Sequence, residues 1–323
     1  MSLRHIEMPA HSNTKRQLFY AILCAVTMAN LFLTLTPVIK TRAIKGCEDA
    51  WHFVEYIPSA YERGWTENIG RLQGDVCGET KKQMAEVNQW MSRSDMSTDI
   101  FSVFKFRNNC TGEVSLDYIE PLVGLTRSPY FCVYGDAHVV SKDYLVVSPT
   151  SRRGAKAYLF DLGSSLYNSG AGGASQQWFV DTYNIKWDGI FAWDAMAYSP
   201  SEFWTLVPKH LKPIYHFYNI PVSPEPNHPD NALDYILRVA RPEDFVLLKI
   251  DIDNTPVEEA LVDQILASEA LLGLIDEFYF EHHVNIGPMN GYWGTGSSDK
   301  TLADTYRIFT TMRNKGILAH GWV

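Results

Sequence analysis

The sequence lacks charge over one long stretch where a soluble domain would carry it. No charged side chain lies between Leu18 and Ile39, although Lys15 and Arg16 precede this run and Lys40 follows it. About 20 apolar residues suffice for a helix to cross the hydrocarbon core of a bilayer. The run is too long for the apolar region of a cleaved signal peptide, and no A-x-A-like cleavage site follows it. The sequence therefore predicts a single transmembrane anchor at these residues.

Concentrated positive charge is also missing. The net charge is −9 at pH 7, and beyond Lys45 the basic residues cluster only at Arg152-Arg153 with Lys156. Nucleic-acid binding requires clustered lysine and arginine to neutralise phosphates, so the sequence argues against a nucleic-acid partner. Internal repeats and low-complexity tracts are absent as well. With 46% hydrophobic and 13% aromatic residues, the chain has the composition of a globular protein with a substantial core.

Cysteine is absent from the second half of the chain. Apart from Cys24 in the predicted anchor, the cysteines are Cys47, Cys77, Cys110 and Cys132. Four cysteines confined to one stretch suit two disulfides in an oxidising compartment. They also suit four ordinary buried thiols, and the sequence leaves both the choice and the pairing open.

The membrane orientation depends on features other than flanking charge. Lysine and arginine are equally frequent on the two sides of the predicted anchor, so the positive-inside rule favours neither orientation. Asn109-Cys110-Thr111 is an acceptor sequence for N-glycosylation, which takes place in the secretory lumen. Together with the cysteines, it favours a type II single-pass protein of the endoplasmic reticulum or Golgi. Residues 1–17 would form the cytoplasmic tail, 18–39 the anchor, and the rest a luminal body.

The luminal body divides into two stretches of different character. Residues 40–150 show no regular pattern apart from one helix expected near Glu79–Met91, so we expect an irregular extension that contains the cysteines. In residues 151–323, short apolar runs alternate with helical stretches. This alternation is typical of a parallel sheet with helices on both faces, a Rossmann-like α/β fold. Strands are expected at 157–163, 189–195, 213–220, 244–252, 274–284 and 316–323, with helices at 174–183, 201–207, 231–240, 256–267 and 300–314.

Polar residues follow several of the expected strands. In parallel sheets, ligands bind beyond the carboxyl ends of the strands. Gly163, after the first strand, would let the backbone approach a ligand closely before the next helix begins. Asp194, at the end of the second strand, fits an acidic residue that binds ribose hydroxyls. Thr255 is expected to cap the helix at 256–267, with Pro256 at its first position.

A cluster of carboxylates and histidines is expected at the ends of the fourth and fifth strands. Asp251, Asp253 and Glu281 offer oxygen ligands that suit a divalent metal ion. Alternatively, Asp251 or one of His282 and His283 acts as a general base on a substrate hydroxyl. Successive residues of a strand point to opposite faces, so the two histidines should not both face the crevice.

Five segments occur in the order and rough spacing of a known family: DLGSS, FAWDA, YHFYNIPVS, LLKIDIDN and FYFEHHV. Residues of about 155–323 thereby resemble FkbM-type methyltransferases. The clearest segment, FVLLKIDIDNTPVEEAL, is similar to the family's K-x-D-x-E-G motif followed by a helix. The family's glutamate is Asp253 in this chain and its glycine is Asn254, and Leu166–Ala171 form an insertion in the cofactor loop.

The resemblance implies a class I fold that binds S-adenosylmethionine and methylates hydroxyl groups, often of sugars or polyketides. Carried over, Asp161, Gly163 and the adjoining Ser164 would belong to the cofactor loop, Asp194 would meet the ribose, and Asp251 would lie at the reaction crevice. We therefore expect a membrane-anchored O-methyltransferase with a small-molecule or glycan substrate.

Two other functions stay open at this point. A membrane-anchored glycosyltransferase could use Asp251 and Asp253 as a D-x-D motif for a metal ion and a nucleotide sugar. A non-catalytic module could have kept the methyltransferase-like fold without the activity. Binding of S-adenosylmethionine or of nucleotide sugars would separate these functions.

Overall fold

The computed structural model describes residues 51–72, 74–82, 97–124, 126, 132, 136–147, 156–170, 174–286 and 299–322. They all belong to one compact unit, Glu48–Val323. The predicted anchor at 18–39 and its cytoplasmic tail lie outside the described residues. Among the residues that are described, no helix is both long and apolar enough to cross a membrane.

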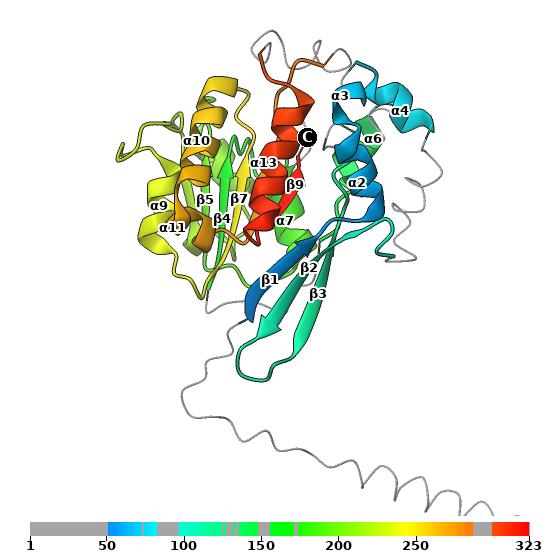
Figure 1. The fold of residues 1–323 in the computed structure, drawn as a ribbon. Helices are drawn as coiled ribbons and strands as arrows, with labels where there is room; N and C mark the ends of the chain where they lie inside the picture. Colours follow the sequence, from blue (N-terminus) through cyan, green and yellow to red (C-terminus); the bar gives the residue numbers. More distant parts are fainter. Residues whose placement is uncertain are drawn as a thin grey trace, which may run out of the picture. The chain divides into compact units, whose positions relative to one another are not determined.

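Six parallel strands form the central sheet (Figure 1). The spatial order is β6-β5-β4-β7-β8-β9, so the first strand of the sheet, β4, lies between β5 and β7. This is the doubly wound order, in which the direction of strand addition reverses between β4 and β7. The predicted parallel, Rossmann-like α/β fold is therefore confirmed. The strands are β4 (Ala157–Leu162), β5 (Gly189–Trp193), β6 (Tyr215–Tyr218), β7 (Phe245–Ile250), β8 (Glu277–Phe280) and β9 (Leu318–Gly321).

Helices cover both faces of this sheet, which explains why its strands are almost continuously apolar. Every residue of β4, β5, β7, β8 and β9 is buried. In Figure 1, α9, α10, α11 and α13 lie in front of the sheet and α7 lies behind it. The helices are α7 (Ser175–Tyr183), α8 (Pro200–Leu206), α9 (Ala232–Val239), α10 (Thr255–Ala267), α11 (Glu269–Leu274) and α13 (Leu302–Asn314), with the short 3-10 helix η2 at Lys212–Ile214.

The start of α10 differs by one residue from the prediction. Asn254 is the N-cap, and its side chain accepts a hydrogen bond from the Val257 N–H, while Thr255 is already the first helical residue. The expectation that Thr255 caps the helix is wrong. Asp253 has a φ of 57°, so the chain turns sharply just before the cap.

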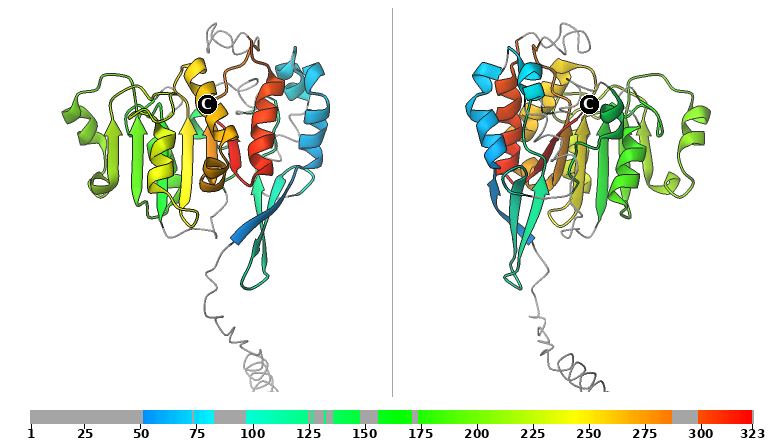
Figure 2. Two further views of the ribbon diagram at one scale, coloured as in Figure 1. Left: turned by 60° about the vertical axis from the view of Figure 1, so that its left-hand side comes forward. Right: turned by 90° about the vertical axis from the view of Figure 1, so that its right-hand side faces the viewer.

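The extension before the parallel sheet is not irregular, contrary to the prediction. It contains a three-stranded antiparallel sheet in the order β1-β2-β3. Figure 2 shows the β2–β3 hairpin projecting beyond the parallel sheet in both views. The elements are β1 (Trp51–Ile57), α2 (Ala60–Glu67), α3 (Ile69–Leu72), α4 (Val76–Lys82), β2 (Ser102–Asn108), β3 (Val114–Ile119) and α6 (Asp136–Ser141). Of the helix expected near Glu79–Met91, α4 covers the first residues, and 83–91 lie outside the described residues.

A buried arginine joins this extension to the edge of the parallel sheet. Arg313 of α13 is fully buried and donates hydrogen bonds to the Ala319 and Glu120 carbonyl oxygens and to the Tyr56 hydroxyl. Its guanidinium also lies 3.1 Å from the Glu62 carboxylate. Buried charges require such partners, so the extension and the sheet form one interdependent core.

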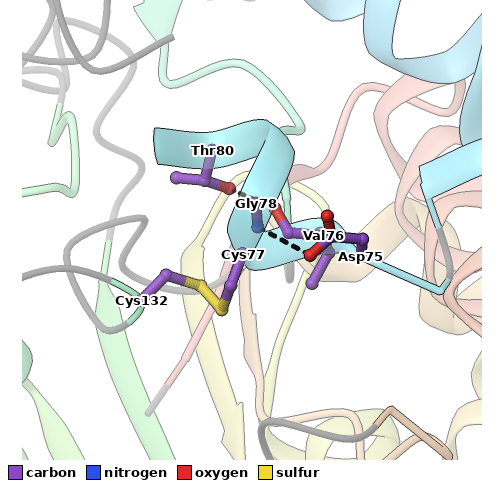
Figure 3. The surroundings of a disulfide bond; sticks show 6 residues. All are labelled: Asp75, Val76, Cys77, Gly78, Thr80 and Cys132. Atoms are coloured by element: carbon purple, nitrogen blue, oxygen red, sulfur yellow. Dashed lines mark hydrogen bonds between the residues drawn. A yellow bond between two sulfur atoms is a disulfide. The ribbon is translucent and has the colours of Figure 1, made fainter. Parts of the chain in front are cut away.

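A disulfide links Cys77 of α4 to Cys132 (Figure 3). Asp75 lies directly before α4, and its side chain accepts a hydrogen bond from the Gly78 N–H. Cys110 is also disulfide-bonded. Of the two alternatives left open by the sequence, the structure therefore has disulfides rather than buried thiols at these three positions.

Candidate functional site

The loops after β4 and β7 meet at the point where the strand order reverses. The Asp251 N–H donates to the Leu162 carbonyl oxygen at 3.1 Å, and the Gly163 N–H donates to the Trp193 carbonyl oxygen at 3.0 Å. A Cβ atom on Gly163 would lie 1.6 Å from the Asp251 carbonyl oxygen, and the φ of Gly163 is +77°. Glycine is therefore required here because two backbones cross in contact, a reason that the sequence pattern did not reveal.

A buried lysine contacts both of these loops. Lys249 Nζ lies 3.0 Å from Asp161 Oδ1 and 3.2 Å from Asp251 Oδ2, and it donates to the Gly163 carbonyl oxygen at 2.8 Å. Burial by itself would lower the pKa of Lys249, but the two carboxylates outweigh burial and hold the pKa above its ordinary value. The sequence alone predicted no role for Lys249, although this lysine is part of the segment that resembles the K-x-D-x-E-G motif.

Asp161 and Ser164, both expected in the cofactor loop, are fully buried. Asp161 accepts a hydrogen bond from the Ser175 hydroxyl in addition to its ion pair with Lys249. The Ser164 carbonyl oxygen accepts a hydrogen bond from the Gln176 side chain. Through these contacts, Asp161 and Ser164 hold the loop after β4 in place, while Gly163 contacts the Asp251 backbone.

Asp194 holds the same loop from the neighbouring strand. One of its carboxylate oxygens accepts the Ser165 N–H at 2.6 Å, and the other accepts the Met196 N–H at 2.7 Å. A carboxylate has about four acceptor positions, so each oxygen keeps capacity for a further donor. Asp194 therefore lies against the loop that contains Gly163.

Two exposed apolar side chains flank Asp194. Met196, after β5, is 66% exposed, and Ile220, after β6, is 41% exposed. Asn219 ties the two loops together, because its amide donates to the Asp194 and Met196 carbonyl oxygens. These residues could not be found from the sequence, since nothing in a linear pattern shows that an apolar side chain remains exposed.

A second group of polar residues lies at the ends of β7 and β8. One ligand atom from each of Asp253, Glu281 and His283 lies within 4.8 Å of the other two. His283 Nε2 is 3.3 Å from Glu281 Oε2, and its Nδ1 is 3.2 Å from the Thr255 hydroxyl. The predicted metal set was Asp251, Asp253 and Glu281. The structure groups two of these with His283, while Asp251 pairs with Lys249.

Burial raises the pKa of two carboxyl groups close to these residues, those of Asp251 and Glu258. Burial raises the pKa of Asp251 more than Lys249 lowers it, and the neighbouring Glu281 raises it further. Burial likewise raises the pKa of Glu258, a residue of α10, to about 7, against the opposing effect of His283. Carboxylates held this close together repel one another unless a proton or a cation lies between them. The site is therefore suited to hold positive charge.

His282 faces away from this group, as the alternation of strand side chains predicted for one of the two histidines. Its Nδ1 lies 2.8 Å from the Thr305 hydroxyl of α13, and its Nε2 lies 3.8 Å from Glu259. Burial lowers the pKa of His282 to about 4. Of the two candidate histidines, only His283 is thus grouped with Asp253 and Glu281 in the part of the chain that the structure describes.

Comparison with known proteins gave no match for this chain. No protein-family model matches the chain, and neither a curated protein nor a solved structure matches it. The fold and the site define a Rossmann-like α/β protein with polar side chains gathered at its switch point. The resemblance to FkbM-type methyltransferases stays a prediction from the quoted segments.

Proposed function

We propose that this chain is an S-adenosylmethionine-dependent O-methyltransferase that acts on a hydroxyl group of a small molecule or glycan. The observation that carries the proposal is the hydrogen bond between Asp194 at the end of β5 and the loop after β4, next to the backbone crossing at Gly163. A glycine loop beside an acidic strand end, at a topological switch point, is the arrangement that binds nucleoside cofactors in doubly wound sheets.

The residues around Asp194 fit the chemical parts of this cofactor. The free acceptor positions of Asp194 suit the two ribose hydroxyls. The exposed side chains of Met196 and Ile220 offer apolar surface to a flat adenine ring, a use that would account for their exposure. Asp161 is fully buried, so in this proposal it acts through Lys249 and the loop and does not touch the cofactor.

Asp251 is the residue that we assign to the acceptor. When bound, the cofactor supplies an electrophilic methyl group. In this proposal, the acceptor oxygen would bond to the methyl group as the carbon–sulfur bond of the cofactor breaks, and the Asp251 carboxylate would take the proton of the acceptor hydroxyl. Lys249 orients this carboxylate, since Lys249 Nζ lies 3.2 Å from Asp251 Oδ2. Asp251 follows β7 directly, beside the loop that would hold the cofactor, and this placement supports its role.

The proposed membrane location rests on the chain's N-terminal part and on its processing signals. Residues 18–39 would anchor the protein with its body in the secretory lumen. The Cys77–Cys132 disulfide suits an oxidising compartment. Asn109 is exposed in the turn between β2 and β3, where a glycan could be attached.

Cofactor affinity tests the proposal directly. Calorimetry on the full-length chain in detergent should show S-adenosylmethionine binding that Asp194→Ala weakens by roughly 10–100-fold, since one or two charge-assisted hydrogen bonds are lost. Asp188→Ala is the matched control, because Asp188 lies before β5 and hydrogen-bonds the Ala157 N–H at the opposite end of the sheet. Unchanged affinity in Asp194→Ala would refute the assignment.

A glycosyltransferase is the second candidate, and the group of Asp253, Glu281 and His283 favours it because nucleotide sugars are commonly bound through a metal ion. In that case, the same calorimetry would detect nucleotide-sugar binding that depends on a divalent ion, and no binding of S-adenosylmethionine. Binding of S-adenosylmethionine without transfer to any hydroxylated acceptor would instead indicate a non-catalytic module.

A further inference from the structure

The strongest unexplained feature of the molecule is the convergence of carboxylates beside His283. Asp253 and Glu281 each place an oxygen within 4.8 Å of a His283 ring nitrogen and of each other. Asp253 is exposed, whereas Glu281 and His283 are buried. The three residues come from two different loops, after β7 and after β8, so the tertiary fold rather than a local turn assembles them.

A fourth side chain is aimed at this group from α10. Glu258 is fully buried, and one of its oxygens, Oε1, accepts the Ile252 N–H at 2.7 Å. The other, Oε2, has no hydrogen-bond partner among the described residues and lies 4.0 Å from His283 Nδ1. A buried carboxylate oxygen without a partner is costly unless positive charge is nearby.

We propose that Asp253, Glu281 and His283 bind a divalent first-row transition-metal cation, Mn²⁺ or Zn²⁺. Two carboxylates and one imidazole are ligands that such ions accept. Ligand atoms at about 2.2 Å from an ion can be at most about 4.4 Å apart, so separations within 4.8 Å require at most a small closure of the group. The exposed side chain of Asp253 can rotate to allow this closure.

In this proposal, Glu258 and Thr255 do not bind the metal themselves but hold the His283 ring in its orientation. A histidine that binds a metal through one ring nitrogen usually donates its other N–H to a carboxylate or another acceptor, which fixes its tautomer. His283 Nε2 faces Glu281, and its Nδ1 faces both the Thr255 hydroxyl and the free oxygen of Glu258. The metal would therefore bind at Nε2. The positive charge that reaches the imidazole would compensate the buried Glu258 carboxylate.

The imidazole also decides which ions are preferred. Mg²⁺ and Ca²⁺ favour sites made wholly of oxygen ligands, whereas imidazole suits transition metals. We therefore expect Mn²⁺ or Zn²⁺ to bind more tightly than Mg²⁺. The inference does not rest on the proposed methyl transfer, because metal binding can be measured without a methyl donor.

The test is metal binding to the purified full-length chain in detergent after removal of metals by a chelator. Titration with MnCl₂, followed by calorimetry and by the Mn²⁺ electron paramagnetic resonance signal, should show one site per chain. Asp253→Asn should weaken Mn²⁺ binding at least 10-fold, since even the loss of an outer-shell partner commonly costs 10–100-fold. The exposed position and positive φ of Asp253 are compatible with asparagine, so this variant should fold.

Glu259→Gln is the matched control. Glu259 is the neighbour of Glu258 on α10, but it pairs with Lys300 and faces His282. Its variant should bind Mn²⁺ as the unchanged chain does, whereas His283→Gln should lose the site. The proposal is overturned if neither Mn²⁺ nor Zn²⁺ binds saturably, or if Asp253→Asn and His283→Gln bind as tightly as Glu259→Gln. Loss of metal binding with S-adenosylmethionine binding retained would remove this site and leave the proposed function standing.

Discussion

At the scale of single residues, the switch point depends on side chains that act through backbone contacts. Gly163 allows the loop after β4 to touch the loop after β7, and Lys249 holds the carbonyl oxygen of the same glycine. Asp194 fixes the next turn of the loop through the Ser165 N–H. The position of the Asp251 carboxylate follows from these contacts.

Gly163→Ala should destabilise the protein by roughly 2–5 kcal/mol, since the new Cβ would collide with the Asp251 carbonyl oxygen and alanine is strained at a φ of +77°. Urea unfolding of the full-length chain measures the change. Gly64→Ala is the control, because Gly64 lies in α2 with no neighbour within 4 Å of an added Cβ, and alanine favours helix there. Equal unfolding midpoints for the two variants would contradict the importance of the crossing.

Asp251→Asn should lower the rate of methyl transfer by about 10²–10⁴-fold with cofactor binding largely kept. The reason is that an asparagine side chain cannot take up the proton of the substrate hydroxyl. The measurement is transfer of labelled methyl from S-adenosylmethionine to a hydroxylated sugar. His283→Ala should also lower turnover, whereas His282→Ala should have little effect, since His282 faces Thr305 on α13. If all three variants retain full turnover, the reaction takes place elsewhere.

At the scale of elements, the antiparallel sheet and α13 depend on each other. Phe104 and Phe106 of β2 pack with Leu318 of β9, so the small sheet closes one edge of the large one. Arg313 of α13 meets the carboxylates of Glu62 and Glu120, which belong to the extension. The edge strand β9 is thus covered by polar as well as apolar contacts with the extension.

Arg313→Met should destabilise the protein by about 3–5 kcal/mol, because it leaves the buried Glu62 carboxylate without its cation, whereas Glu120 keeps its contact with His320. Arg307→Met is the control on the same helix, since the Arg307 side chain is 62% exposed and its pair with Asp304 is a surface one. The control should cost less than about 1 kcal/mol. Denaturant unfolding of both variants decides the matter, and similar costs for the two would show that the buried network contributes little.

At the scale of the whole molecule, the predicted membrane anchor with a luminal body leads us to expect a glycan on Asn109. Asn109 lies in the turn of a hairpin that Figure 2 shows projecting away from the parallel sheet, so a glycan there would leave the candidate site accessible. The Cys77–Cys132 disulfide closes a loop with a sequence separation of 55 and belongs to the same extension.

Membrane-bound protein from cells with a secretory pathway should carry a glycan that a glycosidase removes and that Asn109→Gln abolishes. Deletion of residues 1–40 should release soluble protein, because the apolar run would be gone. Extraction with alkaline carbonate measures integration into the membrane. Full-length protein that alkaline carbonate strips from the membrane would refute the anchor.

Much of the fold could be predicted from local patterns. The six strands of the parallel sheet and the five helices expected in residues 151–323 all appear, because apolar runs bounded by turn residues and N-caps are properties of short segments. The antiparallel sheet was missed, since β1 pairs with β2 about 50 residues later, as in the pair Glu55 and Lys105. Neither strand shows in its own segment that a partner lies so far along the chain.

The candidate site shows the same division. The sequence by itself determined which residues stand at the carboxyl ends of the strands, since the apolar runs end directly before Asp194, Asp251 and Glu281. Only the tertiary structure decided which of them meet: Asp251 pairs with Lys249, and His283 joins Asp253 and Glu281 in one group. The physical reason is that the grouping depends on how the loops of adjacent strands cross, and the contact of Gly163 with the Asp251 backbone sets that crossing across nearly 90 residues of chain.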